Sequence, residues 1–214
     1  MANLNAMREE GEVVVLKGEL YAVLGYSPEE ESEHLTIEKY HHNVPKYDYW
    51  YDISSKLPEE KSTGYTRAVA LEDRLYIVDF LGIEIYDPEE DKWSKGKGFN
   101  FDRTDFAIVG LNKSLYVIGG VTFEEDIPNV VISSVEKYDI GSDTWTQVAS
   151  LRRARTGLSA IVVDGRIFVI GGNDAEGEGL STIDVYNPQV DKWDEGEFPP
   201  LPTPRAYVGL ALSK

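Results

Sequence analysis

Residues 165–172 read GRIFVIGG, and residues 186–193 read YNPQVDKW. The first stretch is an apolar run that follows a turn and ends in two glycines, and the second places a tyrosine seven positions before a tryptophan. Both patterns also occur one repeat earlier, as KSLYVIGG at 113–120 and YDIGSDTW at 138–145. Because their order and spacing are kept, the chain contains an internal repeat, and such a repeat decides the architecture.

The spacing of tyrosine and tryptophan extends the repeat toward the start of the chain. Tyr86 and Trp93 form a further pair, and Tyr86 lies 52 residues before Tyr138, which in turn lies 48 residues before Tyr186. A period of about 50 residues is too long for a single helix or hairpin and is typical of a repeated supersecondary unit.

A fourth copy is indicated 46 residues before Tyr86, at Tyr40. The residues IEKY that end at Tyr40 match the VEKY that ends at Tyr138. Two readings remain for the tryptophan of this copy. It is either Trp50, displaced by an insertion around Pro45, or it is replaced at the seven-residue position by Tyr47.

Each repeat contains four short runs rich in β-branched and aromatic residues. Gly, Asn, Asp and Pro separate these runs, and no helical period of useful length is present, so we expect strands throughout. The third run ends near the tyrosine and the fourth begins near the tryptophan. The first runs lie at 13–16, 68–71, 106–111 and 158–163, and the second runs at 18–25, 73–79, 113–120 and 165–172.

Four strands in each repeat are typical of the blade of a β-propeller. A double glycine followed by Tyr-x6-Trp at this period resembles the Kelch repeat, most clearly in the third and fourth copies. The resemblance implies an all-β, Kelch-type β-propeller with four four-stranded antiparallel blades. We expect a polar segment at 1–10, a propeller at 11–214 with repeats at about 11–57, 63–102, 103–152 and 153–200, and a terminal strand at 205–213.

The repeat count leaves the closure of the ring open. Proteins that resemble Kelch domains usually have six or seven blades, and this chain has four followed by an apolar run at 206–212. That run is either a closing strand or an extra inner strand. The ring is therefore either incomplete, with blades missing upstream of Met1, or closed with four blades, and an incomplete ring is expected to oligomerise through its open edges.

The repeated glycines and aromatic residues are expected to belong to the scaffold. The glycines suit positive φ or a close approach of two backbones, and the aromatic rings suit packing between blades. Trp145 and Trp193 are expected to be mostly buried. The structural set comprises Gly25, Gly119, Gly120, Gly171, Gly172, Tyr40, Tyr86, Trp93, Tyr138, Trp145, Tyr186 and Trp193.

One position of the repeat is rich in arginine. Alignment on the turn before the second strand places five residues at this position, at the start of each innermost strand, where they would ring one mouth of the propeller channel. They are either structural or a cradle for acidic or phosphorylated peptide groups, which guanidinium groups bind bidentately. The aligned residues are Arg8, Thr63, Arg103, Arg155 and Tyr207, with Arg153 and Arg205 beside them.

The other polar clusters in the sequence do not indicate a metal site or a catalytic site. The loops after the second strands are acidic, but their spacing matches no calcium loop. The histidines show no spacing typical of a metal site or a catalytic triad. We therefore expect no cofactor, no metal and no catalytic residue. The acidic loops contain Glu29–Glu31, Glu124–Asp126, Asp174, Glu176 and Glu178, and the histidines are His34, His41 and His42.

Composition narrows the class of protein. The 214 residues include 38 Asp and Glu against 21 Lys and Arg, a formal charge of −17, which disfavours nucleic acid and anionic membranes as partners. The absence of cysteine excludes disulfides and thiolate zinc sites. No apolar run approaches the ~20 residues that cross a bilayer. We expect a soluble, cytoplasmic protein.

The leading functional hypothesis is a non-enzymatic module that binds another protein. The resemblance to Kelch domains implies this role, and it also implies substrate recognition for a cullin-based ubiquitin ligase adaptor. Actin binding is an alternative that has precedents among similar proteins. A propeller enzyme acting on sugars is another; the copper radical oxidases of this type need a cysteine, which the chain lacks.

Overall fold

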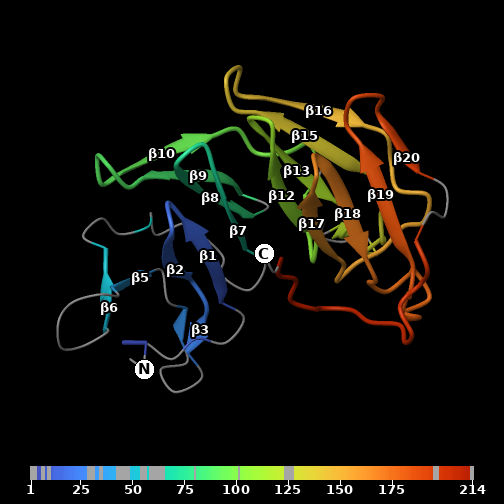
Figure 1. The fold of residues 1–214 in the computed structure, drawn as a ribbon, viewed down its shortest axis with the longest axis horizontal. Coiled ribbons are helices and arrows are strands. Elements are labelled where there is room, and N and C mark those ends of the chain that lie inside the picture. The colour runs from blue at the N-terminus through green and yellow to red at the C-terminus, as the bar shows by residue number, and fades with distance from the viewer. Residues whose placement is uncertain are drawn as a thin grey trace. The chain divides into compact units, whose positions relative to one another are not determined.

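The computed structural model describes residues 4–5, 8, 11–27, 32–33, 36–41, 49–53, 57, 66–79, 81–100, 102–122, 128–194 and 198–212. These residues form an all-β fold of four four-stranded antiparallel sheets and two short two-stranded ribbons (Figure 1). Each four-stranded sheet is one propeller blade, as the repeat predicts. No helix in these ranges is long and apolar enough to cross a membrane. The chain divides into two compact units, unit 1 at Met1–Gly98 and unit 2 at Phe99–Lys214.

Unit 1 contains blades 1 and 2, each with its strands side by side in chain order. Blade 1 also carries the ribbon of β3 (Tyr26–Ser27) and β4 (Ser32–Glu33) between its second and third strands. Blade 1 consists of β1 (Glu12–Leu16), β2 (Glu19–Val23), β5 (Ile37–His41) and β6 (Tyr49–Asp52), and blade 2 of β7 (Arg67–Leu71), β8 (Arg74–Asp79), β9 (Gly82–Asp87) and β10 (Lys92–Gly96).

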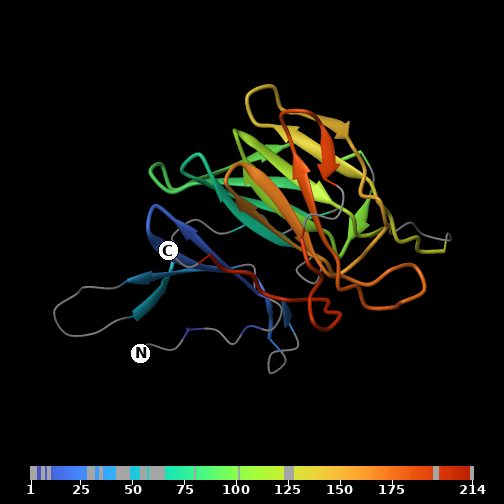
Figure 2. The ribbon, with the colours of Figure 1, turned by 45° about the vertical axis from the view of Figure 1, so that its right-hand side comes forward.

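Unit 2 contains blades 3 and 4 and the ribbon of β11 (Arg103–Thr104) and β14 (Val121–Thr122). The segment 198–212 follows the last strand and passes the ends of the blade 4 strands, as the red trace in Figure 2 shows. Blade 3 consists of β12 (Ala107–Leu111), β13 (Ser114–Ile118), β15 (Val135–Asp139) and β16 (Thr144–Val148), and blade 4 of β17 (Ser159–Val163), β18 (Arg166–Ile170), β19 (Ile183–Asn187) and β20 (Lys192–Asp194).

The tyrosine and tryptophan of each repeat are cross-strand neighbours on the third and fourth strands. In blades 2 to 4 the rings lie 5.0–5.1 Å apart between centroids. Tyr40 pairs with Trp50 in the same way, with centroids 5.1 Å apart. The structure therefore assigns Trp50 as the tryptophan of the first repeat, and the insertion before it lengthens only the connection between β5 and β6.

A tyrosine–aspartate hydrogen bond closes the turn between these two strands. The Tyr186 hydroxyl donates to Asp191 Oδ1 at 2.7 Å, and the Ala149 amide donates to the same oxygen at 2.8 Å. Trp193 Nε1 donates to the Ala149 carbonyl at 2.7 Å. Burial and the Asp191 carboxylate raise the pKa of Tyr186 far above its usual range, so the phenol remains a donor. Blade 4 thereby holds the segment that arrives from blade 3.

Replacing Asp191 by alanine is expected to destabilise the protein by about 1–2 kcal/mol, because two donors lose a charged acceptor at a partly exposed site. Asp191→Asn is the matched control. It keeps an acceptor and tolerates the positive φ of 50° at this position, so it should lose less. Urea denaturation checks both variants. Equal losses for alanine and asparagine would contradict the role of the hydrogen bonds.

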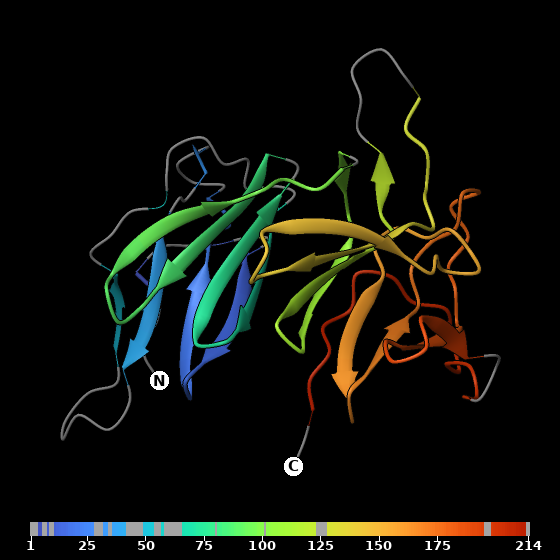
Figure 3. The ribbon, with the colours of Figure 1, turned by 90° about the horizontal axis from the view of Figure 1, so that it is seen from above.

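Within each unit the second blade packs one face against the first. The face of blade 4 that carries Tyr186 and Trp193, the Tyr/Trp face, contacts the opposite face of blade 3, where Tyr116 and Ile118 lie. Tyr116 and Tyr186 meet edge to face with centroids 5.9 Å apart. Figure 3 shows the two sheets of unit 2 as separate twisted layers. Blade 2 packs its Tyr86 side on blade 1 in the same manner.

The tryptophans are less buried than expected. Trp145 and Trp193 are half-buried, whereas Tyr138 and Tyr186 are each 2% exposed. The reason is position: each tryptophan lies on the outermost strand, where only one side of the ring has a neighbouring strand. The tyrosines lie one strand further in.

The double glycines have the expected conformation. Gly119, Gly120, Gly171 and Gly172 all have positive φ, and so does Gly25 in blade 1. At Gly120 a Cβ atom would lie 2.5 Å from the Thr104 carbonyl oxygen. Both reasons for glycine, the dihedral angle and the close approach, therefore apply at this position.

Blade 2 departs from the others where its sequence lacks the double glycine. Asp79 is buried, and its Oδ1 accepts hydrogen bonds from the amides of Leu81 and Gly82. These bonds turn the chain directly from β8 into β9. Blade 2 consequently lacks the long connection that follows the second strand in the other three blades.

The terminal strand expected at 205–213 is not formed by its described residues, 205–212. Tyr207 N instead donates to the Gly157 carbonyl, and Ser159 Oγ donates to the Val208 carbonyl. These isolated contacts hold the segment beside the start of β17. A strand requires a ladder of paired backbone groups, and no neighbouring strand among the described residues supplies one to 206–212.

Candidate functional site

The arginine-rich position of the repeat lies four residues before the innermost strand of each blade. Arg103 precedes β12 in this way and Arg155 precedes β17. Each arginine reaches across its own blade to the acidic residue two positions before the repeat tyrosine. Arg103 Nη2 lies 2.6 Å from Glu136 Oε2, and Arg155 pairs with Asp184. Arg8 pairs with Glu38 at 2.9 Å in blade 1.

The guanidinium groups also donate to backbone carbonyls at the ends of the strands. Arg103 Nη1 donates to the carbonyls of Gly119 and Ser134 at 3.2 and 3.1 Å. Arg155 Nη1 donates to the carbonyl of Gly171 at 3.1 Å. Each arginine thus ties the carbonyl of the first glycine to the third strand. We call this arrangement the arginine–carboxylate lock.

These locks are buried. The side chains of Arg103 and Glu136 are both 0% exposed, and those of Arg8 and Arg155 are 3% and 1% exposed. Burial lowers the pKa of Arg103 and of Arg155, and the adjacent carboxylate opposes the change in each case. The expectation that these three arginines face a partner at a channel mouth is corrected: their charge is neutralised and their donors are used within the blade.

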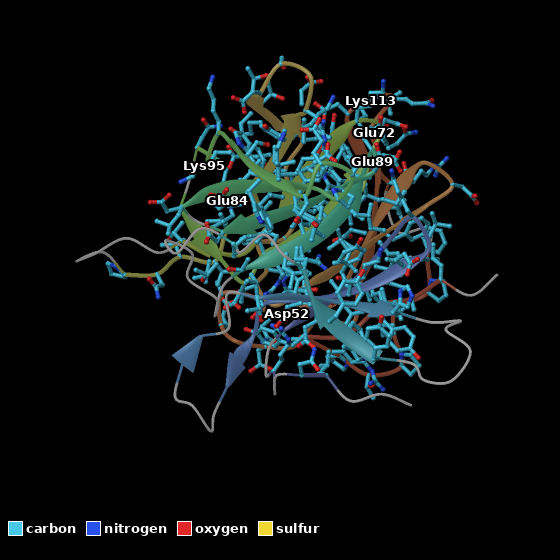
Figure 4. The ribbon with its side chains drawn as sticks, turned by 90° about the vertical axis from the view of Figure 1, so that its left-hand side faces the viewer. Asp52, Glu72, Glu84, Glu89, Lys95 and Lys113 are labelled. Atoms are coloured by element: carbon cyan, nitrogen blue, oxygen red, sulfur yellow. The ribbon has the colours of Figure 1, made fainter. Side chains whose placement is uncertain are left out.

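Blade 2 has the carboxylate of the lock with a different cation. Glu84, two positions before Tyr86, is 4% exposed and lies 3.7 Å from Lys95 Nζ on the neighbouring strand. Figure 4 shows the two side chains beside each other on β9 and β10. Thr63, which the alignment places at the arginine position, lies outside the described residues.

The terminal segment repeats the path that leads into blade 4. Arg155 N donates to the Ile132 carbonyl and its own carbonyl accepts from Gly120; Arg205 makes the same pair of bonds with Leu180 and Gly172. Arg205 is therefore the structural equivalent of Arg155.

The backbone two residues later gives the same register. Asp105, Gly157 and Tyr207 have φ angles of 51°, 60° and 53°. Tyr207 thus matches Gly157 and not, as the sequence alignment proposed, the arginines. That alignment was anchored on the turn before the second strand, and the sequence after 206–212 contains no such turn to anchor on.

Three residues singled out in the sequence do reach the surface. Arg205 and Tyr207 are exposed, Tyr207 by 63%, and the Arg153 side chain is 56% exposed. They lie on the side of unit 2 from which the chain enters its blades. We call this side the entry face, and it consists of residues 102–105, 119–122, 128–134, 151–157, 171–182 and 201–207.

The acidic loop of blade 4 belongs to the same entry face. Asp174 is buried and pairs with Arg153 Nη2 at 2.5 Å, and its other oxygen accepts from the amides of Glu176 and Glu178. The sequence analysis placed acidic loops and arginines on different connections, whereas the structure brings them together here. The acidic runs at 29–31 and 124–126 lie outside the described residues.

The histidines and carboxylates of the described residues form no metal cluster. No group of three or more His, Asp or Glu side chains there could hold a metal ion. His41 lies against Tyr49, with ring centroids 5.4 Å apart, and His34 and His42 are outside the described residues. The chemistry that the entry face offers is the binding of anionic groups by guanidinium and of flat groups by the Tyr207 ring.

The sequence analysis missed the carboxylates of the lock. Glu38, Glu84, Glu136 and Asp184 all stand two residues before the repeat tyrosine, and this regularity is visible in the sequence. An acidic residue in a strand of alternating pattern, at an equivalent place in every repeat, was the available signal. It lies 29–33 residues from its arginine in the three locks, so pattern alone does not join the two.

Comparison with known proteins finds the Kelch motif in the same residues as the repeat of blades 3 and 4. A family model described as the Kelch motif matches residues 102–152 and 154–197, which contain blades 3 and 4. Kelch-like protein 35 of Mus musculus is 28% identical over 196 residues, covering 88% of this chain and 31% of that protein. Kelch repeat and BTB domain-containing protein 12 of Homo sapiens is 31% identical over 133 residues, covering 57% and 21%.

A plant protein shows the same partial coverage. An F-box/kelch-repeat protein of Arabidopsis thaliana is 33% identical over 132 residues, covering 56% of this chain and 34% of that protein. The chain thus spans between about a fifth and a third of the length of these three relatives.

Proposed function

Because the chain is a Kelch-repeat protein, we propose that it is a non-enzymatic module whose protein partner binds the entry face of unit 2. The observation that carries this proposal is the contrast between equivalent arginines. Arg103 and Arg155 are buried in locks, whereas Arg205 is exposed, and so is most of the neighbouring Arg153 side chain, although its Nη2 pairs with Asp174.

The partner segment proposed for this face carries carboxylate or phosphate groups. Guanidinium binds both in a bidentate manner, and Tyr207 adds a ring of large contact area at low entropic cost. Tyr207 has φ of 53°, which is unusual for a bulky residue and is a feature that clusters at functional sites. The whole chain has a formal charge of −17, which repels an acidic partner, so such a partner must be bound locally by these two arginines.

The role proposed within the cell is substrate recognition for a cullin-based ubiquitin ligase in the cytoplasm. The names of two relatives include a BTB domain and an F-box next to the Kelch repeats. In this role the bound partner is the protein to be modified, and the chain supplies the recognition surface only.

Capture of partners from cell extract by the immobilised chain tests the binding role. The partner should be recovered in a stoichiometric amount, and Arg153→Ala and Tyr207→Ala should each weaken its binding by about 3- to 30-fold. Binding should also weaken as salt is raised. Arg166→Ala is the matched control, because Arg166 is partly exposed at the opposite end of blade 4, at the start of β18.

The outcome that contradicts the proposal is a partner whose affinity is the same for the wild type, Arg153→Ala and Tyr207→Ala. The proposal would also be contradicted if Arg166→Ala weakened partner binding as much as Arg153→Ala and Tyr207→Ala do, since the binding surface would then extend over the opposite end of the blade. Circular dichroism of each variant checks that the fold is retained.

A further inference from the structure

The two outer strands of blade 1 carry a cluster of aromatic rings beside a lysine. His41 on β5 lies opposite Tyr49 on β6, and Lys39 lies opposite Tyr51. The His41 ring centroid is 5.4 Å from that of Tyr49 and 6.1 Å from that of Tyr51, and the two tyrosine centroids are 6.0 Å apart. We call these four residues the Tyr49 cluster. It lies at the outer edge of the blade, because β6 is the outermost strand (Figure 1).

The other three blades have polar residues at the positions of His41 and Tyr49. In each of them the residue that replaces His41 accepts a hydrogen bond from an amide of the turn that follows. The equivalent pairs are Asp87 with Lys92, Asp139 with Thr144, and Asn187 with Lys192. Blade 1 lacks this acceptor and has two stacked rings in its place, so the packing of a blade does not require the Tyr49 cluster.

Tyr49 differs from the repeat tyrosines in its accessibility. The repeat tyrosines of blades 2 to 4 are 2–3% exposed, and each donates its hydroxyl to an aspartate. Tyr49 is 45% exposed, and its hydroxyl has no hydrogen bond among the described residues. The phenol is therefore accessible to an enzyme while blade 2 is packed on blade 1.

Two side chains of β5 can bind an anion attached to the Tyr49 oxygen. Lys39 Nζ lies 5.6 Å from the centroid of the Tyr21 ring. Burial acts against the ammonium, but Tyr21, Tyr51 and Glu19 outweigh it and raise the pKa of Lys39, so this group is a cation at neutral pH. The His41 imidazole donates hydrogen bonds and gains a positive charge on protonation. Both side chains are within reach of Tyr49, since His41 is its direct neighbour across the strands and Lys39 its diagonal one.

We propose that Tyr49 is a phosphorylation site and that Lys39 and His41 bind the phosphate. The γ-phosphoryl group of a nucleoside triphosphate passes to Tyr49 Oη in the active site of a separate tyrosine kinase. The hydroxyl proton is released, and the nucleoside diphosphate leaves. The inference goes beyond the proposed function, because it concerns unit 1 and does not depend on a partner at the entry face of unit 2.

Phosphorylation at this place joins β5 and β6 instead of separating them. The phosphate carries nearly two negative charges and three acceptor oxygens, which form charge-assisted hydrogen bonds with the cations opposite. Asp52, the exposed carboxylate of β6, lies on the other face of the strand, because side chains alternate. At the equivalent place in blade 2 the carboxylate of Asp87 would repel a phosphate.

The site is tested with a tyrosine kinase chosen because it phosphorylates Tyr49 in the linear peptide of residues 42–56. The full chain is incubated with this kinase and magnesium ATP, and mass spectrometry locates the phosphate. Tyr49 should carry it. Tyr49→Phe should remove it from this segment, whereas Tyr51→Phe should leave Tyr49 phosphorylated.

The second pKa of the phosphate, measured by phosphorus NMR on the phosphorylated chain, tests the role of the two cations. It should be lower by about half a unit than in the linear phosphopeptide, where it is about 6, because nearby cations favour the dianion. Lys39→Met and His41→Phe keep most of the packing and should each raise it toward the peptide value. Lys137→Met is the matched control, because Lys137 has the position of Lys39 in blade 3, and it should change nothing.

Two results would overturn the proposal. The first is a folded chain with no phosphate on Tyr49, since the same kinase accepts this tyrosine in the linear peptide. The second is a phosphate whose pKa equals that of the linear phosphopeptide and is the same in Lys39→Met and His41→Phe, since the cations would then not bind it. Circular dichroism of each variant checks that the fold is retained.

Discussion

Arg103→Ala should lower the free energy of unfolding by about 3–5 kcal/mol, the range observed when one partner of a buried ion pair is removed. The replacement leaves Glu136, whose side chain is 0% exposed, without its principal cation. It also leaves the carbonyls of Gly119 and Ser134 without the donors that Arg103 supplies. Urea denaturation measures the loss, and hydrogen exchange in 135–148 shows whether blade 3 is the part that opens.

Two controls accompany this prediction. Arg205 lies at the equivalent backbone position but forms no lock. Arg205→Ala should therefore change the free energy of unfolding by less than about 0.5 kcal/mol, as ordinary surface substitutions do. The double variant Arg103→Met with Glu136→Gln should lose less than Arg103→Ala, because no charge then remains buried alone. A loss for Arg103→Ala no larger than that for Arg205→Ala would show that the lock adds nothing to stability.

Gly120→Ala should lower the free energy of unfolding by about 2–5 kcal/mol, through strain at positive φ and overpacking together. The φ angle of Gly120 is 102°, and its new methyl group would lie 2.5 Å from the Thr104 carbonyl oxygen and 3.2 Å from Phe106 Cβ. The backbone has little room to yield here, since Gly120 N is hydrogen-bonded to the Arg155 carbonyl at 2.9 Å.

Gly165→Ala is the matched control for the steric part. Gly165 has φ of 73°, but a Cβ atom there would meet nothing within 4 Å. Its replacement should therefore cost about 1 kcal/mol, the strain of the dihedral angle alone. Thermal or urea denaturation of both variants measures the difference. Similar losses at the two positions would mean that the close approach at Gly120 is relieved by a small shift.

The alternation of short apolar runs and the 50-residue period predicted the all-β fold, the four blades and the approximate positions of the first two strands of each blade, whereas the strand expected at 205–213 is not formed by its described residues. They could do so because strand pairing inside a blade joins neighbours in the sequence. A short turn joins the first strand to the second in every blade, and side chains of alternating pattern identify the buried faces. The positive φ of the double glycines was also predictable, since only glycine adopts it at little cost.

Contacts between residues distant in the sequence decide whether each arginine is buried or exposed. The sequence alignment places Arg103 and Arg155 at one position before an apolar run, and the structure adds Arg205 to that position in place of Tyr207. The structure buries the first two because a carboxylate 33 or 29 residues further on reaches them across a complete blade. Arg205 has no such carboxylate among the described residues and stays exposed.

What the sequence determined by itself is therefore the blade and its number of copies, because the information for a blade is local and repeated. What only the tertiary structure decided is which repeated side chains are structural and which are available to a partner. That distinction depends on desolvation and ion pairing, and both are set by the neighbour that the fold brings to each residue, not by the residue's own position in the repeat.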